Sequence, residues 1–263
     1  YGKENPSYAV SLSGLAVVYH DLGNYAKSEA LSLEILEIQE KILGQDHPDY
    51  LHSLNNLGVH YQTVGSYSKA EPLLVKTKET RGRILGKDHP DYASSLFNLA
   101  SLYIHMRNYA ASESFFLEAI DVQARIFGKD NASYANSLGS LASLFLETQD
   151  YVKAEPLLIE AKEIMVRTLG KEHPDYAYVV NNQAELYRRM GNDEKAEPLF
   201  LESMEQKINH IVRYFPSLSE KEKQSYHASN RIFFANFDKF CLDNGRRNPA
   251  LLSEMYNVKL ATK

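Results

Sequence analysis

Residues 54–73 read LNNLGVHYQTVGSYSKAEPL, and residues 84–92 read ILGKDHPDY. In the first stretch Leu54, Leu57 and Tyr61 are three and four residues apart, which places them on one face of a helix. A Gly-Ser pair then interrupts the pattern, and apolar residues resume at helical spacing after it. The two stretches therefore predict a pair of amphipathic helices joined by a tight turn.

This helix pair recurs every 42 residues along the chain, without an insertion. Three rows of matching positions carry the repeat: Tyr8, Tyr50, Tyr92, Tyr134 and Tyr176; Leu12, Leu54, Leu96, Leu138 and Val180; and Tyr19, Tyr61, Tyr103, Phe145 and Tyr187. A fourth row, Leu15, Leu57, Leu99 and Leu141, is broken by Gln183. Five in-phase units predict an all-α solenoid, in which each helix pair packs on its neighbours.

Residues that begin and end helices recur with the same period. Three sets share one repeat position each: the N-cap types Asn24, Ser66, Asn108, Asp150 and Asn192 before each second helix; Gly44, Gly86, Gly128 and Gly170 after it; and Pro48, Pro90 and Pro174 at the start of the next first helix. Side chains of the first set can accept a hydrogen bond from an unpaired backbone N–H. The helix boundaries therefore follow from local chemistry as well as from apolar spacing.

The units resemble the 42-residue tetratricopeptide repeats of kinesin light chains. The resemblance covers residues 1–215 and rests on the two stretches quoted above. It implies a right-handed superhelix whose first helices line a concave groove. Tyr1–Asn5 match Phe127–Asn131 in the repeat, so we expect residues 1–5 to be the tail of a further repeat upstream.

The period stops after residue 215, and residues 216–263 form a second predicted region of capping helices. Tyr226, Phe233, Phe237 and Phe240 follow one helical stripe there. Because the last pair of a solenoid has an apolar face without a neighbour, we expect this stripe to cover the fifth pair. The segment also resembles the connector that follows such repeats in bacterial CHAT proteins, which implies a caspase-like protease domain downstream.

Composition and charge exclude several classes of function. The net charge of −5 gives no positive field for nucleic acid, and no apolar run reaches the ~18 residues that a membrane span needs. One cysteine, Cys241, cannot form a disulfide within the chain and fits a reducing, cytoplasmic setting. The sequence holds no phosphate-binding loop, serine triad or paired carboxylates, so we predict neither enzyme activity nor a cofactor.

Two sets of residues could suggest chemistry, and each has a simpler interpretation. His47, His89 and His173 precede Pro, and their repeat equivalents are asparagines that ligate metals poorly. We therefore predict that these histidines cap helices and hold no metal. Cys241 and His227 are fourteen residues apart on one predicted helix, roughly 21 Å, so a buried, unreactive thiol is favoured over a protease dyad.

The inner surface of the solenoid is the predicted binding site. Asparagine is disfavoured in helix interiors, yet it recurs on the side of the first helices opposite the apolar rows. The predicted groove residues are Asn55, Asn56, Asn98, His105, Asn136, Asn181, Asn182, Arg188 and Arg189. Amides can both donate to and accept from a peptide backbone, and the two arginines can bind a carboxylate. The alternative is that these amides only pack between neighbouring helix pairs.

Two functions follow from this pattern. The first is a protein- or peptide-binding scaffold that holds an extended segment in the concave groove. The second, implied by the CHAT resemblance, is the sensor arm of a caspase-like protease. An RNA-binding helical repeat is disfavoured because the chain has no basic stripe.

Overall fold

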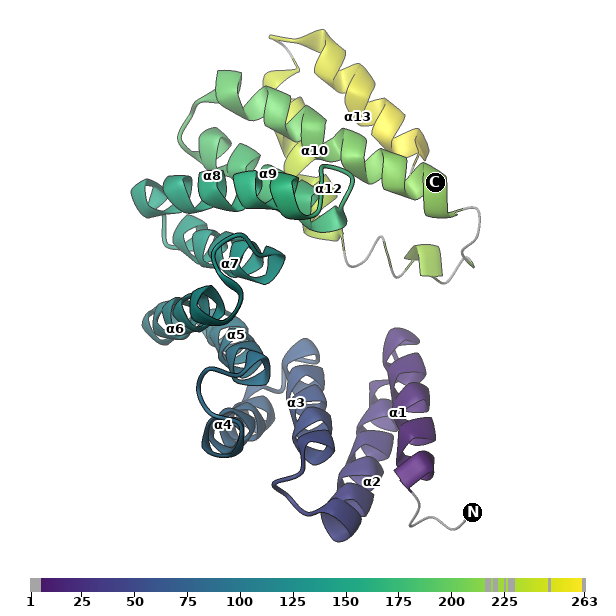
Figure 1. Cartoon of the computed structure of the whole chain (residues 1–263). Helices are drawn as coiled ribbons and strands as arrows, with labels where there is room; N and C mark the ends of the chain where they lie inside the picture. The colour runs from purple at the N-terminus through teal and green to yellow at the C-terminus, as the bar shows by residue number, and fades with distance from the viewer. Residues whose placement is uncertain are drawn as a thin grey trace. The chain divides into compact units, whose positions relative to one another are not determined.

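The computed structural model describes residues 6–215, 219, 222–224, 226, 230–245 and 247–261. In the described residues every element is a helix, and no strand is present (Figure 1). The helices are α1 Pro6–Asp21, α2 Tyr25–Leu43, α3 Pro48–Thr63, α4 Tyr67–Ile84, α5 Pro90–His105, α6 Tyr109–Phe127, α7 Ala132–Glu147, α8 Tyr151–Thr168, α9 Pro174–Arg189, α10 Asp193–Tyr214, α12 Arg231–Asn244 and α13 Pro249–Ala261. The predicted all-α class and the predicted helix pairs are confirmed.

The chain forms two compact units, Tyr1–Ile126 and Phe127–Lys263. The first contains α1–α6 and the second contains α7–α13, so each has its own set of packed helix pairs. The boundary lies between the third and fourth repeats, at a glycine-containing connection. The predicted domain limits, 1–215 and 216–263, stay a prediction.

The predicted caps form at nearly every repeat. Side-chain oxygens of Asn24, Asn108, Asp150 and Asn192 accept a hydrogen bond from the backbone N–H three residues later, whereas Ser66 makes no such bond. The glycines that end the second helices have φ between 75° and 85°, a region that residues with a Cβ rarely adopt. Sequence alone therefore specifies where the helices begin and end.

The D/E-H-P histidines act as helix caps, as predicted. The Nδ1 atoms of His47, His89 and His173 accept a hydrogen bond from the backbone N–H two residues later, at 3.1–3.2 Å. An imidazole nitrogen thus satisfies one of the N–H groups that a helix start leaves without a partner. In the part of the chain that the structure describes, no three His, Cys, Asp or Glu side chains form a group that could hold a metal ion.

Three tyrosines of the repeated aromatic row tie a first helix to the second helix before it. Each phenol donates to a glutamate 32 residues earlier in the sequence, and the bonds are Tyr61 to Glu29 (2.6 Å), Tyr103 to Glu71 (2.7 Å) and Tyr187 to Glu155 (2.9 Å). Burial and this bond raise the pKa of Tyr61 to about 12, so the phenol stays protonated at neutral pH. A polar contact therefore repeats along the stack beside the apolar core.

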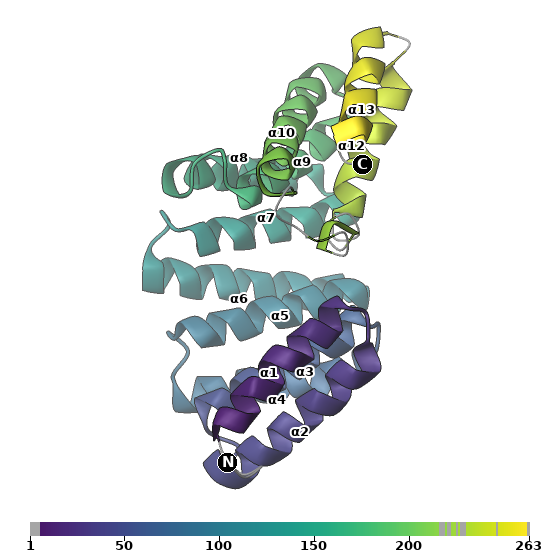
Figure 2. The same ribbon diagram turned by 90° about the vertical axis from the view of Figure 1, so that its right-hand side faces the viewer.

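The C-terminal helices α12 and α13 pack on the fifth pair, α9 and α10. Phe233, Phe237 and Phe240 of α12 are buried in one cluster with Phe200 and Met204 of α10. Both views place α12 and α13 beside α10, on the side away from α8 (Figure 2). The predicted covering of the fifth pair is confirmed for these two helices.

Candidate functional site

Three of the predicted groove asparagines link neighbouring first helices. In the first unit, Nδ2 of Asn98 on α5 donates to Oδ1 of Asn55 on α3 at 2.9 Å, and Asn55 is only 9% exposed. In the second unit, Nδ2 of Asn182 on α9 donates to Oγ of Ser143 on α7 at 2.9 Å. Each pair lies about one repeat apart in the sequence, so these amides connect successive repeats. Packing between neighbouring repeats is therefore a demonstrated role of Asn55, Asn98 and Asn182.

Two further groove asparagines lie on α7 and α9. Nδ2 of Asn136 donates to a carboxylate oxygen of Asp175 at 3.0 Å. Asn181 is 3% exposed, and its Oδ1 accepts no hydrogen bond from the described residues. An unsatisfied buried carbonyl costs free energy, and Asn181 lies too deep to contact a ligand without rearrangement.

The two predicted groove arginines bind a carboxylate of the chain itself. Glu185, which is nearly buried, accepts from Arg188 at 2.7 and 2.8 Å and from Arg189 at 2.6 Å. Burial alone would raise the pKa of Glu185, but these hydrogen bonds and charges lower it below its ordinary value. Arg189 also donates to the backbone oxygen of Leu146 at 2.8 Å, near the end of α7. Arg189 thus links α9 to α7, whereas the ion pair of Arg188 lies within α9.

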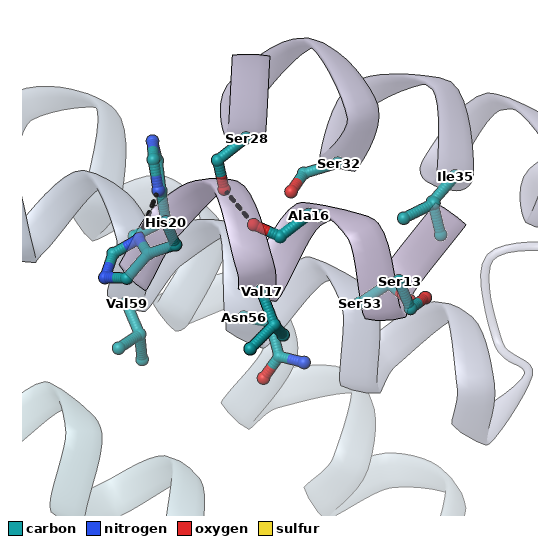
Figure 3. Close-up of a pocket in the computed structure, with 11 residues that line it drawn as sticks. Ser13, Ala16, Val17, His20, Ser28, Ser32, Ile35, Ser53, Asn56 and Val59 are labelled. Atoms are coloured by element: carbon teal, nitrogen blue, oxygen red, sulfur yellow. Dashed lines mark hydrogen bonds between the residues drawn. The ribbon is translucent and has the colours of Figure 1, made fainter. Parts of the chain in front are cut away.

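Asn56 and His105 are the most accessible of the predicted residues in the first unit. Both are exposed, and the His105 ring stacks on Tyr67 with ring centroids 5.9 Å apart. Asn56 lines a pocket of about 290 Å³ between α1, α2 and α3 (Figure 3). Hydroxyl groups of Ser13, Ser32 and Ser53 line the same pocket beside aliphatic side chains. A cavity of this size accommodates one or two side chains of a bound segment.

A histidine pair closes one end of this pocket, and the sequence analysis did not single it out. Nδ1 of His20 on α1 lies 3.0 Å from Nδ1 of His60 on α3, a hydrogen bond in which one ring donates an N–H to the other (Figure 3). Burial, and then the neighbouring His20, lower the pKa of His60. The sequence does mark this position, because a histidine interrupts a row of apolar residues there. The repeat equivalents of His60 are Val18, Leu102, Leu144 and Leu186.

The lowered pKa of His60 predicts a pH-dependent stability of the first unit. The folded chain binds a proton at His60 less readily than the unfolded chain does, so its stability is full above the ordinary histidine pKa and falls as the pH drops below it. His60→Leu restores the residue type of three equivalent positions and is expected to raise the free energy of unfolding at pH 5 relative to the natural chain. Urea titrations at pH 5 and pH 8 measure this; a gain of equal size at both pH values would contradict it.

Cys241, which is predicted to be an unreactive thiol, lies in the core of the second unit. Cys241 is fully buried within the α10–α12–α13 cluster, whereas its nearest histidine in sequence, His227, lies outside the described residues. Burial among aromatic rings keeps a thiol from reacting with solutes. Across the described helices, none is both long enough and apolar enough to span a bilayer.

Solved structures with the same fold include kinesin-light-chain-type repeats. A kinesin light chain of Podosopora anserina with nearly identical TPR-like repeats is 24% identical, with a TM-score of 0.66, over 78% of this chain and 97% of that chain. BtubC (BKLC) from P. vanneervenii is 20% identical, with a TM-score of 0.66, over 76% and 79%. The Rap conjugation gene regulator of plasmid pLS20, solved in complex with the Phr* peptide, is 12% identical, with a TM-score of 0.60, over 94% and 72%. At these identities the likeness shows the fold alone, and it confirms the predicted kinesin-light-chain-like repeat.

No curated protein gives a match to the chain. The family model described as tetratricopeptide repeat matches four overlapping stretches, residues 7–81, 61–124, 94–158 and 134–208. Together these stretches run from residue 7 to residue 208, which is well over half of the chain. The 42-residue period and the helix pairs agree with this family model. The chain therefore belongs to the tetratricopeptide repeat family.

Proposed function

We propose that the chain is a binding scaffold whose first helices hold an extended segment of a partner protein. The observation that carries this proposal is the orientation of the inner amides. Asn98 and Asn182 each donate through Nδ2 to the preceding repeat, and Oδ1 of each has no assigned donor among the described residues. A carbonyl oxygen held in a fixed direction can accept a hydrogen bond from a backbone N–H of a ligand.

The wider context supports the same proposal. Repeats of this family are typically non-catalytic scaffolds, and a structural relative was solved in complex with a peptide. The pocket of about 290 Å³ between α1, α2 and α3 gives the first unit a place for a side chain beside Asn56. Each hydrogen bond contributes only about 1 kcal/mol net, so affinity depends on several contacts together.

Replacing two inner amides is expected to weaken this binding without unfolding the chain. The probe is a peptide enriched from a random phage-displayed library on the immobilised chain. The double variant Asn98→Ala with Asn182→Ala is expected to bind it roughly ten- to a hundredfold more weakly by fluorescence anisotropy, since about two hydrogen bonds are lost.

The matched control changes two exposed residues of the second helices, Glu79→Ala with Glu163→Ala. This pair is expected to leave the affinity unchanged, and circular dichroism melts check that both double variants fold. Equal weakening by both pairs, or weakening by the control pair alone, would contradict binding through the first helices.

A further inference from the structure

A groove of about 750 Å³ lies between α10, the last repeat helix, and α13. Its floor is apolar, because Met204 of α10 and Leu251 and Val258 of α13 are buried there. Leu201 and Ile208 of α10 add partly buried aliphatic surface. This C-terminal groove opens between the last second helix and the non-repeat helix α13, and the asparagines of the inner surface do not line it.

The preceding repeat has an equivalent groove with different chemistry. It lies between α8 and α10, with a volume of about 690 Å³. Five positions of α8 in that groove correspond, one repeat later, to five positions of α10 in the C-terminal groove: Ile159 to Leu201, Lys162 to Met204, Glu163 to Glu205, Val166 to Ile208 and Arg167 to Asn209. Both cations on this wall are therefore replaced by neutral side chains, while the glutamate is kept.

The exchange makes the C-terminal groove acidic. Four glutamates line it, and its described lining includes no lysine, arginine or histidine. Two of the four are satisfied internally: Glu197 accepts from Asn248 at 2.8 Å, and Glu202 accepts from two lysines and a tyrosine. Glu205 and Glu254 are exposed and form no ion pair with a described residue, so their negative charges face the groove uncompensated.

One wall of the C-terminal groove is formed by α13, because the repeats end at α10. In three earlier repeats the glutamate equivalent to Glu197 accepts from a tyrosine of the next first helix, as Glu155 does from Tyr187. At the end of the stack this acceptor is bound by Asn248, which precedes α13. In the preceding groove, α10 contributes Glu194, Lys195, Pro198 and Leu199. Because α13 is not a repeat helix, it contributes Ala250, Leu251, Glu254 and Val258 instead, a glutamate without a lysine.

We propose that the C-terminal groove binds a segment of a partner protein that carries lysine or arginine beside bulky aliphatic residues. The aliphatic side chains lie against Leu201, Ile208 and Leu251, where their burial removes apolar surface from water. The cationic head group lies near Glu205 and Glu254, which line the groove from α10 and α13. A long basic side chain suits both parts, since its methylene stem packs on apolar surface while its charge stays near water.

The test uses a fluorescein-labelled amphipathic peptide of about 14 leucine and lysine residues, a length that forms about four helical turns. A second probe has the same sequence with glutamate in place of every lysine. The natural chain is expected to bind the lysine probe at least tenfold more tightly than the glutamate probe by fluorescence anisotropy. Glu205→Gln with Glu254→Gln is expected to weaken the lysine probe at least tenfold.

The controls lie outside the C-terminal groove: Glu163 and Val166 are the repeat equivalents of Glu205 and Ile208, and Glu172 is an exposed glutamate of the same unit. Glu163→Gln with Glu172→Gln removes the same charge elsewhere on the second unit and is expected to leave the affinity unchanged. Ile208→Ser is expected to weaken binding, whereas Val166→Ser, its equivalent in the preceding groove, is not. Equal weakening by the two charge pairs would indicate diffuse attraction and overturn the proposal, as would equal binding of both probes. Because the inner variants Asn98→Ala and Asn182→Ala are expected to bind the lysine probe normally, this test is independent of the function proposed above.

Discussion

Phe240→Ala is expected to lower the free energy of unfolding of the chain by about 3–5 kcal/mol, because it empties a fully enclosed site. The Phe240 side chain is 0% exposed, and its ring lies 4.8 Å, centroid to centroid, from that of Phe200 on α10. The same cluster includes Cys241 and Leu251, so the cavity would lie where α10, α12 and α13 meet. Urea denaturation followed by circular dichroism measures the loss.

The matched control is Leu242→Ala on the same helix. Leu242 is 62% exposed, so its truncation is expected to change the free energy of unfolding by less than about 0.5 kcal/mol. Hydrogen exchange locates the effect of Phe240→Ala, because amides of α12 and α13 should lose protection before those of α8. A similar small effect of both variants would mean that the C-terminal helices contribute little to the fifth pair.

The helix pairs and their limits could be predicted because their causes are local. Apolar spacing, N-cap side chains and glycines with positive φ act within a few residues, and the 42-residue period multiplies each signal five times. The covering role of α12 could be predicted for the same reason, since Phe233, Phe237 and Phe240 share one helical stripe. The attached protease domain implied by the connector resemblance stays a prediction.

The hydrogen-bond partners of the predicted groove residues could not be predicted in the same way. Asn98 meets Asn55, and Arg189 meets Leu146, across 43 residues each, and the contact depends on which rotamer each side chain adopts in the assembled stack. Helical phase placed these residues on the inner side but did not distinguish an accessible amide from a buried one such as Asn181. The C-terminal groove could not be predicted either. Because α13 is not a repeat helix, the 42-residue period does not give its position relative to α10.

Glu202→Gln is expected to destabilise the chain by about 2–3 kcal/mol at pH 7 and by progressively less as the pH falls below about 4.5. Glu202 of α10 accepts hydrogen bonds from Tyr176 at 2.6 Å, Lys171 at 2.9 Å and Lys162 at 3.1 Å. Burial alone would raise the pKa of this carboxyl group, but the three donors lower it to about 2. The carboxylate side chain is 24% exposed, so solvent screens the network only in part.

The pH dependence follows from the two protonation equilibria of Glu202. The unfolded chain takes up a proton near the ordinary glutamate pKa of 4.5, whereas the folded chain does so only near pH 2. The stabilisation is therefore complete above about pH 4.5 and is lost as the pH falls toward 2. Urea titrations of both chains should accordingly give a smaller difference in the free energy of unfolding at pH 3 than at pH 7. The control is Glu160→Gln, one repeat earlier, where the carboxylate accepts from Tyr134 at 3.1 Å and has no assigned lysine donor. Glu160→Gln is expected to lower the free energy of unfolding by about 1 kcal/mol or less at either pH. If the loss caused by Glu202→Gln does not shrink at pH 3, the two lysines stabilise the neutral amide as well as the carboxylate, which would contradict the prediction.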